Sequence, residues 1–164
     1  MRLTDIFLVD TIVEVAKRRG DGSLSPFRRL GPNTIVNIGR VNMAHLWAGD
    51  DAANRSVHEF RFGGEGHVPS NPTQAQPTAA TDTSLYGPTI ISKLASHSYP
   101  DGSSVGKVSF ECEILANEGN GVGAQPYSEV GLYDAQDRLL AHKTFGLITK
   151  SEAIGLVFRY SFIF

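Results

Sequence analysis

The clearest pattern along the chain is an alternation of apolar and polar residues over 107–114. Every second residue there is apolar, and these residues are Val108, Phe110, Cys112 and Ile114. A period of two predicts a β-strand with one buried face. The carboxyl-terminal segment 153–164 has the same period, with a mixed second face and a first face made of Leu156, Phe158, Tyr160, Phe162 and Phe164. A strand with so many large residues on one face is expected at the centre of a sheet.

Five further segments are rich in β-branched and aromatic residues and predict shorter strands. They are residues 34–38, 57–62, 86–97, 129–133 and 138–145. Residues 134–137 predict a tight hairpin turn, and residues 100–102 predict another turn. We expect the strands over 138–145 and 153–164 to pair antiparallel across Lys150 and Ser151.

Two segments nearer the N-terminus show helical spacing instead. Residues 5–19 place apolar side chains about one turn apart, carry basic residues in the last turn and are followed by Gly20, which predicts a short amphipathic helix. Residues 42–48 predict a second, two-turn helix. Residues 20–32 have no periodicity and read as a linker. We therefore expect an N-terminal attachment arm over 1–32 and a sandwich domain over 33–164.

Composition supports a fold with many turns. The 164 residues suffice for one two-layer core, and 17 Gly and 8 Pro are scattered among short apolar runs. These features predict an all-β fold, a mostly antiparallel, jelly-roll-like β-sandwich with one or two short helices near the N-terminus. Residues 69–83 contain three prolines and no large apolar side chain, which predicts a long exposed loop.

Charge and cysteine content exclude several classes of partner. Fifteen Lys and Arg against 17 Asp and Glu give a net charge of -2, without a long block of either sign, so neither nucleic acid nor membrane is expected as a partner. No export signal follows Met1, and no apolar run has the ~18 residues of a spanning helix. With one cysteine, Cys112, no intrachain disulfide is possible. We expect the protein to be made in a reducing cytoplasm.

Histidine and cysteine positions do not suggest a catalytic or metal site. The five histidines are His45, His58, His67, His97 and His142, and they show no metal-ligand spacing. We expect His58 and His142 to be partly exposed sheet residues, and His67, in a glycine-rich loop, to be the one most free to serve a site or an interface. Cys112 lies on the apolar face of its strand and is expected to be a buried, inert thiol.

Other motif matches are weak as well. The glycines at 63, 64 and 66 lack the remainder of a phosphate-binding loop. Acidic residues at Asp50, Asp51, Glu118 and Asp134 do not form a calcium-loop series and fit solvated turns. Residues 54–56 match the glycosylation sequon, but no export signal accompanies this match, so we do not expect glycosylation. We therefore predict no catalytic, cofactor-binding or metal-binding residues, no cofactor and no enzymatic activity.

Several short motifs follow one another between residues 33 and 150. The first three are N-T-I-V-N-I-G at 33–39, F-G-G-E-G at 62–66 and T-D-T-S-L at 81–85; the next three are S-E-V-G-L-Y-D at 128–134, L-A-H-K-T-F at 140–145 and I-T-K at 148–150. In this order they resemble a family of tailed-bacteriophage tail, fibre-attachment and neck (collar) structural proteins. The resemblance covers residues 33–164 and is most specific over 128–150.

The resemblance implies a small β-sandwich that forms a ring or trimer in the virion and attaches fibres or decorates a neck or baseplate, without enzymatic activity. We therefore expect a virion structural protein, made in the host cytoplasm, that binds sister subunits and other phage structural proteins. The arm over 1–32 and the loop over 69–83 are the expected contact elements. Within the motifs, Glu129 is expected to anchor a loop by accepting backbone N–H bonds, and Gly131 to allow close approach of a neighbouring strand.

Two other functions were weighed against this one. A receptor- or glycan-binding module of the tail tip would expose loop aromatics, for which Tyr86, Tyr99 and Tyr127 are the candidates. A cell-wall hydrolase would require converging carboxylates or a histidine-metal cluster, and the spacing supplies neither.

Overall fold

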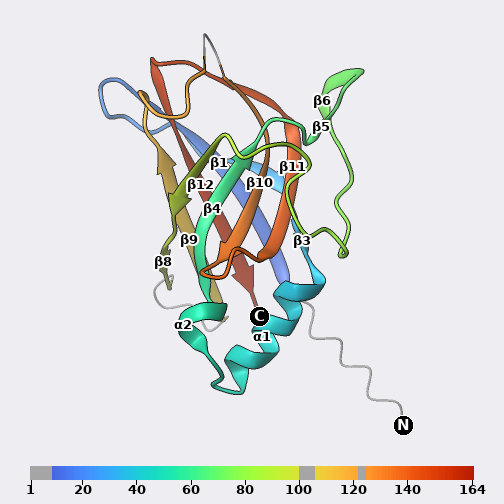
Figure 1. Cartoon of the computed structure of the whole chain (residues 1–164). Helices are drawn as coiled ribbons and strands as arrows, with labels where there is room; N and C mark the ends of the chain where they lie inside the picture. Colours follow the sequence, from blue (N-terminus) through green and yellow to red (C-terminus); the bar gives the residue numbers. More distant parts are fainter. Residues whose placement is uncertain (1–8, 100–105, 122–124) are drawn as a thin grey trace.

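Two antiparallel sheets face each other in the computed structural model of the chain, which describes residues 9–99, 106–121 and 125–164 (Figure 1). The first sheet has the strand order β2-β1-β12-β9-β8, with β2 (Arg28–Gly31), β1 (Asp10–Arg19), β12 (Ile154–Ile163), β9 (Lys107–Ile114) and β8 (Ser96–Ser98). The second has the order β3-β11-β10-β4-β7, with β3 (Thr34–Ile35), β11 (Leu139–Lys150), β10 (Gln125–Asp134), β4 (Val57–Gly63) and β7 (Ile91–Leu94). The predicted all-β sandwich is confirmed.

The remaining elements lie outside the two sheets. The helices α1 (Asn37–Trp47) and α2 (Ala52–Arg55) lie at one end of the sandwich, where Figure 1 shows them below the strands. The strands β5 (His67–Val68) and β6 (Asn71–Ala75) form a separate small hairpin that projects beside β11. The predicted loop over 69–83 is therefore wrong for residues 71–75, although most of that segment is exposed.

Aromatic side chains from both sheets fill the core. The inward face of β12 is fully buried at Leu156, Phe158 and Tyr160. The Phe158 ring lies 4.7 Å from the ring of Phe62, on β4 of the opposite sheet. Because β12 lies between β1 and β9, the predicted central position of the terminal strand is confirmed.

The predicted helix over 5–19 is wrong for residues 10–19, which form the strand β1; residues 5–8 lie outside the described part. β1 pairs with β12 along its whole length, from Asp10 opposite Ile163 to Arg19 opposite Ile154. Its buried residues Val13 and Val15 alternate along the strand and belong to the core. The strands β1 and β2 thus belong to the first sheet, and the predicted boundary at 32 does not separate an appendage from the sandwich.

The predicted pairing of 138–145 with 153–164 is also wrong. β11 pairs with β10 and β3, whereas β12 pairs with β1 and β9. The two strands face each other across the core, where the rings of Phe145 and Phe158 are 5.9 Å apart. The turn after Lys150 therefore carries the chain from one sheet to the other, so that the apolar faces of β11 and β12 pack against each other in the core.

Most other local predictions are confirmed. The strands over 57–62, 107–114 and 129–133 are present as β4, β9 and β10, and the turn over 134–137 joins β10 to β11. The segment 86–97 contains two short strands, β7 and β8, one in each sheet. The second helix is longer than predicted, because α1 begins at Asn37. The turn predicted at 100–102 lies outside the described residues.

Candidate functional site

Glu129 forms the centre of a buried polar cluster between β10 and two loops. One carboxylate oxygen, Oε2, accepts a bond of 2.8 Å from the N–H of Tyr86. The other, Oε1, accepts bonds of 2.9 Å from the N–H of Gly87 and 3.3 Å from the N–H of Glu65. The prediction that Glu129 anchors a loop through backbone N–H groups is confirmed, and it anchors two.

His142 on β11 completes this cluster. Its Nε2 lies 3.2 Å from Glu129 Oε2, and its Nδ1 lies 2.9 Å from Asp82 Oδ2. The ring of His142 therefore bridges the carboxyl groups of Glu129 and Asp82. His142 has no exposed surface, so its predicted partial exposure is wrong. We call Glu129, His142, Asp82 and the backbone N–H groups of Glu65, Tyr86 and Gly87 the loop-fastening centre.

The hydrogen bonds decide the charge of Glu129. Burial raises the pKa of this carboxyl, but the bonds from His142 and from the three backbone N–H groups outweigh burial and hold the pKa below its ordinary value. The carboxylate is therefore ionised at neutral pH, inside the protein. A buried charge of this kind is stable only when its oxygens are bonded, as they are here.

The glycine-rich turn at 63–66 fits around this carboxylate. A Cβ at Gly63 would overlap Glu129 Oε1, and a Cβ at Gly66 would overlap the Ser128 carbonyl oxygen. The turn contributes one backbone N–H, that of Glu65, to the carboxylate of Glu129. At Gly131, a Cβ would overlap the Leu139 side chain, which belongs to the neighbouring strand β11, so the predicted close approach of a neighbouring strand is confirmed.

Ser128 and His67 also lie together, with Ser128 Oγ 3.0 Å from His67 Nδ1. This pair resembles the first two members of a nucleophilic triad. Ser128 is fully buried, however, and its hydroxyl already accepts a bond of 2.8 Å from the N–H of Gly66. The pair holds the glycine-rich turn and does not present a nucleophile to solvent.

Asp134 fastens the helices to the sandwich. Its Oδ2 accepts bonds of 2.7 Å from the Asn42 side chain, on α1, and 2.7 Å from Arg138 Nε. Burial raises the pKa of Asp134, but the bonds from Arg138 and its neighbours reverse this and lower the pKa. Arg138 also bonds to the Asn54 carbonyl of α2. The predicted solvated turn residue is therefore a buried anchor.

Lys150 is fully buried at the end of β11. Its ammonium group donates three bonds of 2.8 Å, to the carbonyl oxygens of Ala116 and Glu118 and to Asn120 Oδ1. Burial lowers the pKa of this lysine. The three bonds fix the loop that follows β9.

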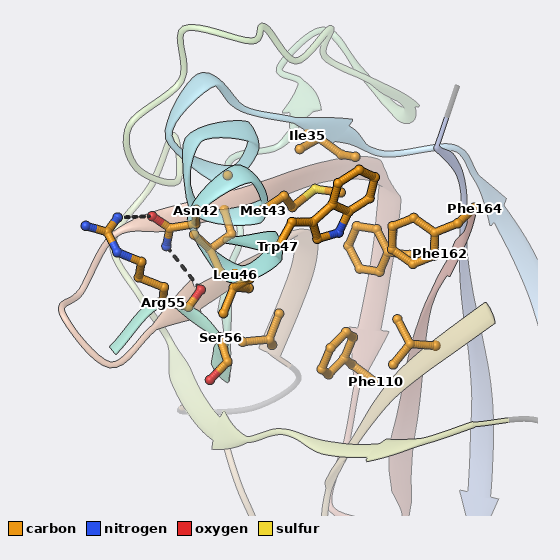
Figure 2. Close-up of a pocket in the computed structure, with 14 residues that line it drawn as sticks. Ile35, Asn42, Met43, Leu46, Trp47, Arg55, Ser56, Phe110, Phe162 and Phe164 are labelled. Carbon is orange, nitrogen blue, oxygen red and sulfur yellow. Dashed lines mark hydrogen bonds between the residues drawn. The ribbon is translucent and has the colours of Figure 1, made fainter. Parts of the chain in front are cut away.

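An apolar groove lies between α1 and the adjacent end of the two sheets (Figure 2). Its cavity volume is about 180 Å³. Figure 2 shows Trp47, Phe162 and Phe164 gathered along one side, with Met43 and Leu46 on α1. Its remaining lining residues are Ile35, Gly39, Asn42, Arg55, Ser56, Val57, Val108, Phe110 and Leu140. We call this feature the apolar groove.

A second groove, which is lined by basic residues, lies between β2 and β11. It consists of two cavities, of about 470 and 340 Å³, that share Arg28 and Leu147. Its cationic residues are Lys17, Arg28, Arg29 and Lys143, and no acidic residue lines it. Within the described part of the chain, none of these four makes an ion pair. We call it the cationic groove.

The other candidate residues do not form a site. No group of three or more possible metal ligands occurs within residues 9–99, 106–121 and 125–164. His45 bonds to Asp50 on the surface, while His58 and His97 are exposed. Cys112 is buried, which raises the pKa of its thiol and confirms the predicted inert cysteine.

The three loop tyrosines do not form an aromatic binding patch. Tyr127 is fully buried, with its hydroxyl donating to the Gly119 carbonyl at 2.6 Å. The Tyr86 hydroxyl donates to the Pro77 carbonyl at 2.6 Å, and its ring lies against His142. Tyr99 lies apart from them, beside His97.

No protein-family model, no curated protein and no solved structure matches the chain. None of the described helices combines the length and apolar character needed to cross a bilayer.

The sequence indicates Glu129 as an anchor, but it indicates neither the partners of Glu129 nor either groove. The apolar face predicted over residues 42–48 supplies Met43, Leu46 and Trp47 to the apolar groove. The sequence contains no signal for the cationic groove, because its basic residues come from three separate segments.

Proposed function

We propose that the protein is a non-enzymatic virion structural protein of a tailed bacteriophage, a subunit of a tail, baseplate or neck (collar) assembly. In this role its copies associate with one another in a ring or trimer and anchor fibres or neighbouring virion proteins. It acts in the virion and without a cofactor.

One observation supports the proposal most. Four of the motifs that carry the resemblance meet in the loop-fastening centre, to which they supply Glu65, Asp82, Glu129 and His142. Glu65 contributes its backbone N–H, while the buried side chains of Glu129 and His142 and the mostly buried carboxyl of Asp82 hold the loops against the sandwich. The motifs therefore encode a rigid scaffold, which is what a structural subunit requires.

The cationic groove supports an anchoring role. β2 is the edge strand of the first sheet, and β11 pairs with β3 only at Ala141 and His142, so within the described residues two strand edges without a neighbouring strand border the groove. An extended segment bonds to such an edge, and carboxylates on that segment pair with Arg28 and Arg29. The partner that fits is an extended acidic segment of a neighbouring virion protein.

Self-association is tested by the mass of the purified protein in light scattering, followed by negative-stain imaging. A ring or trimer is the expected species. A strict monomer at every concentration contradicts the self-association in this proposal.

Anchoring is tested by calorimetric titration with a synthetic peptide of alternating Glu and Thr. We expect binding that weakens as salt is added and is lost in the double variant Arg28→Glu, Arg29→Glu. A peptide of alternating Lys and Thr is the matched control and is expected not to bind. Equal binding of both peptides, or of neither, contradicts the acidic partner.

A further inference from the structure

The two sheets differ on the faces that point away from the core. In the second sheet, β10 is buried on both faces, and every residue from Tyr127 to Asp134 is buried. In the first sheet, the outward side chains are charged and partly exposed. Glu14, Arg159 and Glu111 keep 27%, 34% and 42% of their side-chain surface accessible. We call the outward side chains of β2, β1, β12 and β9 the outer face.

Four charged residues of alternating sign form one row across the outer face. On the two strands nearest the edge, Arg29 of β2 is opposite Glu14 of β1. Arg159 of β12 has Glu14 on one side and Glu111 of β9 on the other. The Arg159 guanidinium lies 2.9 Å from Glu111 Oε2 and 3.9 Å from Glu14 Oε2. The row therefore alternates positive, negative, positive, negative, and we call it the charged row.

A row of this kind is complementary to its own reverse. A second copy turned by 180° about an axis that runs along the strands, between β1 and β12, presents the same face in reversed strand order. Glu14 then faces Arg159 of the second copy, and Arg159 faces its Glu14. At the ends of the row, Glu111 faces Arg29 of the second copy. A two-fold axis along the row would instead place like charges opposite each other, so the row favours the first orientation.

The centre of the outer face is low enough for two copies to approach. Beside the charged row, the outward residues of β1 and β12 include Ala16, Val157 and Ser161, which are small or apolar and at most 2% exposed. β1 and β12 have ten residues each and are about 33 Å long, and four strands are about 19 Å wide. The face thus offers about 600 Å² per copy, which reaches the lower end of the range for stable interfaces.

Arg159 is held in position for contact with a second copy. The Phe27 ring lies over its guanidinium group, with the ring centroid 4.0 Å from the guanidinium carbon. Glu111 holds the same group by two hydrogen bonds, from Nε and Nη2. An arginine that is already ordered loses little side-chain entropy when it pairs with a further carboxylate. Arginine and aromatic residues are also enriched among the residues that contribute most to protein interfaces.

We propose that the outer face of the first sheet binds the same face of a second copy in a two-fold arrangement, with Glu14 of each copy paired with Arg159 of the other. The contact joins copies in pairs, whereas the ring or trimer proposed above requires contacts through other faces. It therefore does not depend on the virion role.

Charge reversal tests this contact in the purified protein. Glu14→Arg places two arginines against Arg159 of the second copy, and Arg159→Glu places two glutamates against its Glu14. In sedimentation velocity over a concentration series, we expect each variant alone to raise the dissociation constant of the pair about tenfold or more. Glu152→Arg, at an exposed glutamate in the turn before β12, is the matched control and is expected to associate like the unmodified protein. Far-UV circular dichroism verifies that each variant retains the β-sandwich.

Mixing the two variants separates loss of contact from loss of folding. In an equimolar mixture, opposite charges again meet at all four positions of the charged row, so we expect a heterodimer although each variant alone remains monomeric. Association of the single variants at the strength of the unmodified protein overturns the proposal and assigns the association to other faces, such as those of the ring or trimer. Variants that stay apart when mixed overturn the two-fold orientation.

Discussion

The loop-fastening centre and the apolar groove solve opposite problems. In the centre, Glu129 and His142 are buried, and their polar atoms have partners from loops that lie far away in sequence. In the groove, apolar residues line a cavity whose rim is exposed. The polar atoms of the centre are satisfied within the chain, whereas the groove leaves apolar surface exposed. The difference teaches that the buried polar residues of this chain serve its own architecture.

The comparison predicts that stability depends far more on the centre than on the groove. The largest effect is expected for Glu129→Ala, which leaves three backbone N–H groups and His142 without their acceptor. Removing one partner of such a buried network costs about 3–5 kcal/mol. Urea unfolding measures it, with Glu152→Ala, at an exposed glutamate, as the control that stays within about 0.5 kcal/mol. A loss below 1 kcal/mol for Glu129→Ala would show that the loops hold without it.

A second test concerns the shape of the centre. Gly66→Ala places a methyl group against the backbone of Ser128, so the glycine-rich turn must move away from Glu129. We expect a loss of about 1–3 kcal/mol in the free energy of unfolding. Gly20→Ala is the matched control, because a Cβ at Gly20 meets no atom within 4 Å. Equal effects of the two substitutions would argue against tight packing at the turn.

Acidification is expected to lower the free energy of unfolding gradually. The pKa of Glu129 in the folded protein lies below its ordinary value of 4.5, so the unfolded chain binds its proton first. The stability from Glu129 is therefore complete above this value and is lost as the pH falls through the lower, folded pKa. Unfolding curves between pH 7 and pH 3 measure this slope, which we expect to be shallower in Glu129→Gln. The same slope in both proteins would assign acid sensitivity to other carboxyls, such as Asp134.

The smallest effect is expected in the groove. Trp47→Ala removes a side chain that is mostly exposed in the described structure, and we expect a loss of about 1 kcal/mol or less. Urea unfolding measures this loss. A loss above about 2 kcal/mol would contradict a side chain that adds little to the packing of the sandwich.

Local pattern predicted the strands that have one dominant period. Residues 107–114 and 153–164 alternate without ambiguity, and both are strands. Residues 10–19 carry two periods at once: Val9, Val13 and Ala16 fit a helix, whereas Val13 and Val15 fit a strand. Pairing with β12, which the local sequence does not contain, decides between them.

Long-range contacts set the limit of prediction for the site as well. The anchoring role of Glu129 followed from a carboxylate placed in a strand, but its partners Glu65, Tyr86 and Gly87 lie 42–64 residues away. The strand pattern around His142 predicts an ordinary, partly exposed sheet residue. The loop that covers His142 carries Asp82 and comes from a distant segment, so the local sequence does not reveal it. The topology of the fold determines which distant segments come into contact, and the spacing of residues along the chain does not predict those contacts.

Lys150 supplies the loop after β9 with a cation that belongs to the chain itself. Its ammonium group contacts three loop oxygens, each 2.8 Å away. Calcium-binding loops in other proteins instead surround a soluble ion with six to eight oxygens, and that ion must be bound from solution. At Lys150 the positive charge is covalently attached, so one cation is present for every copy of the loop.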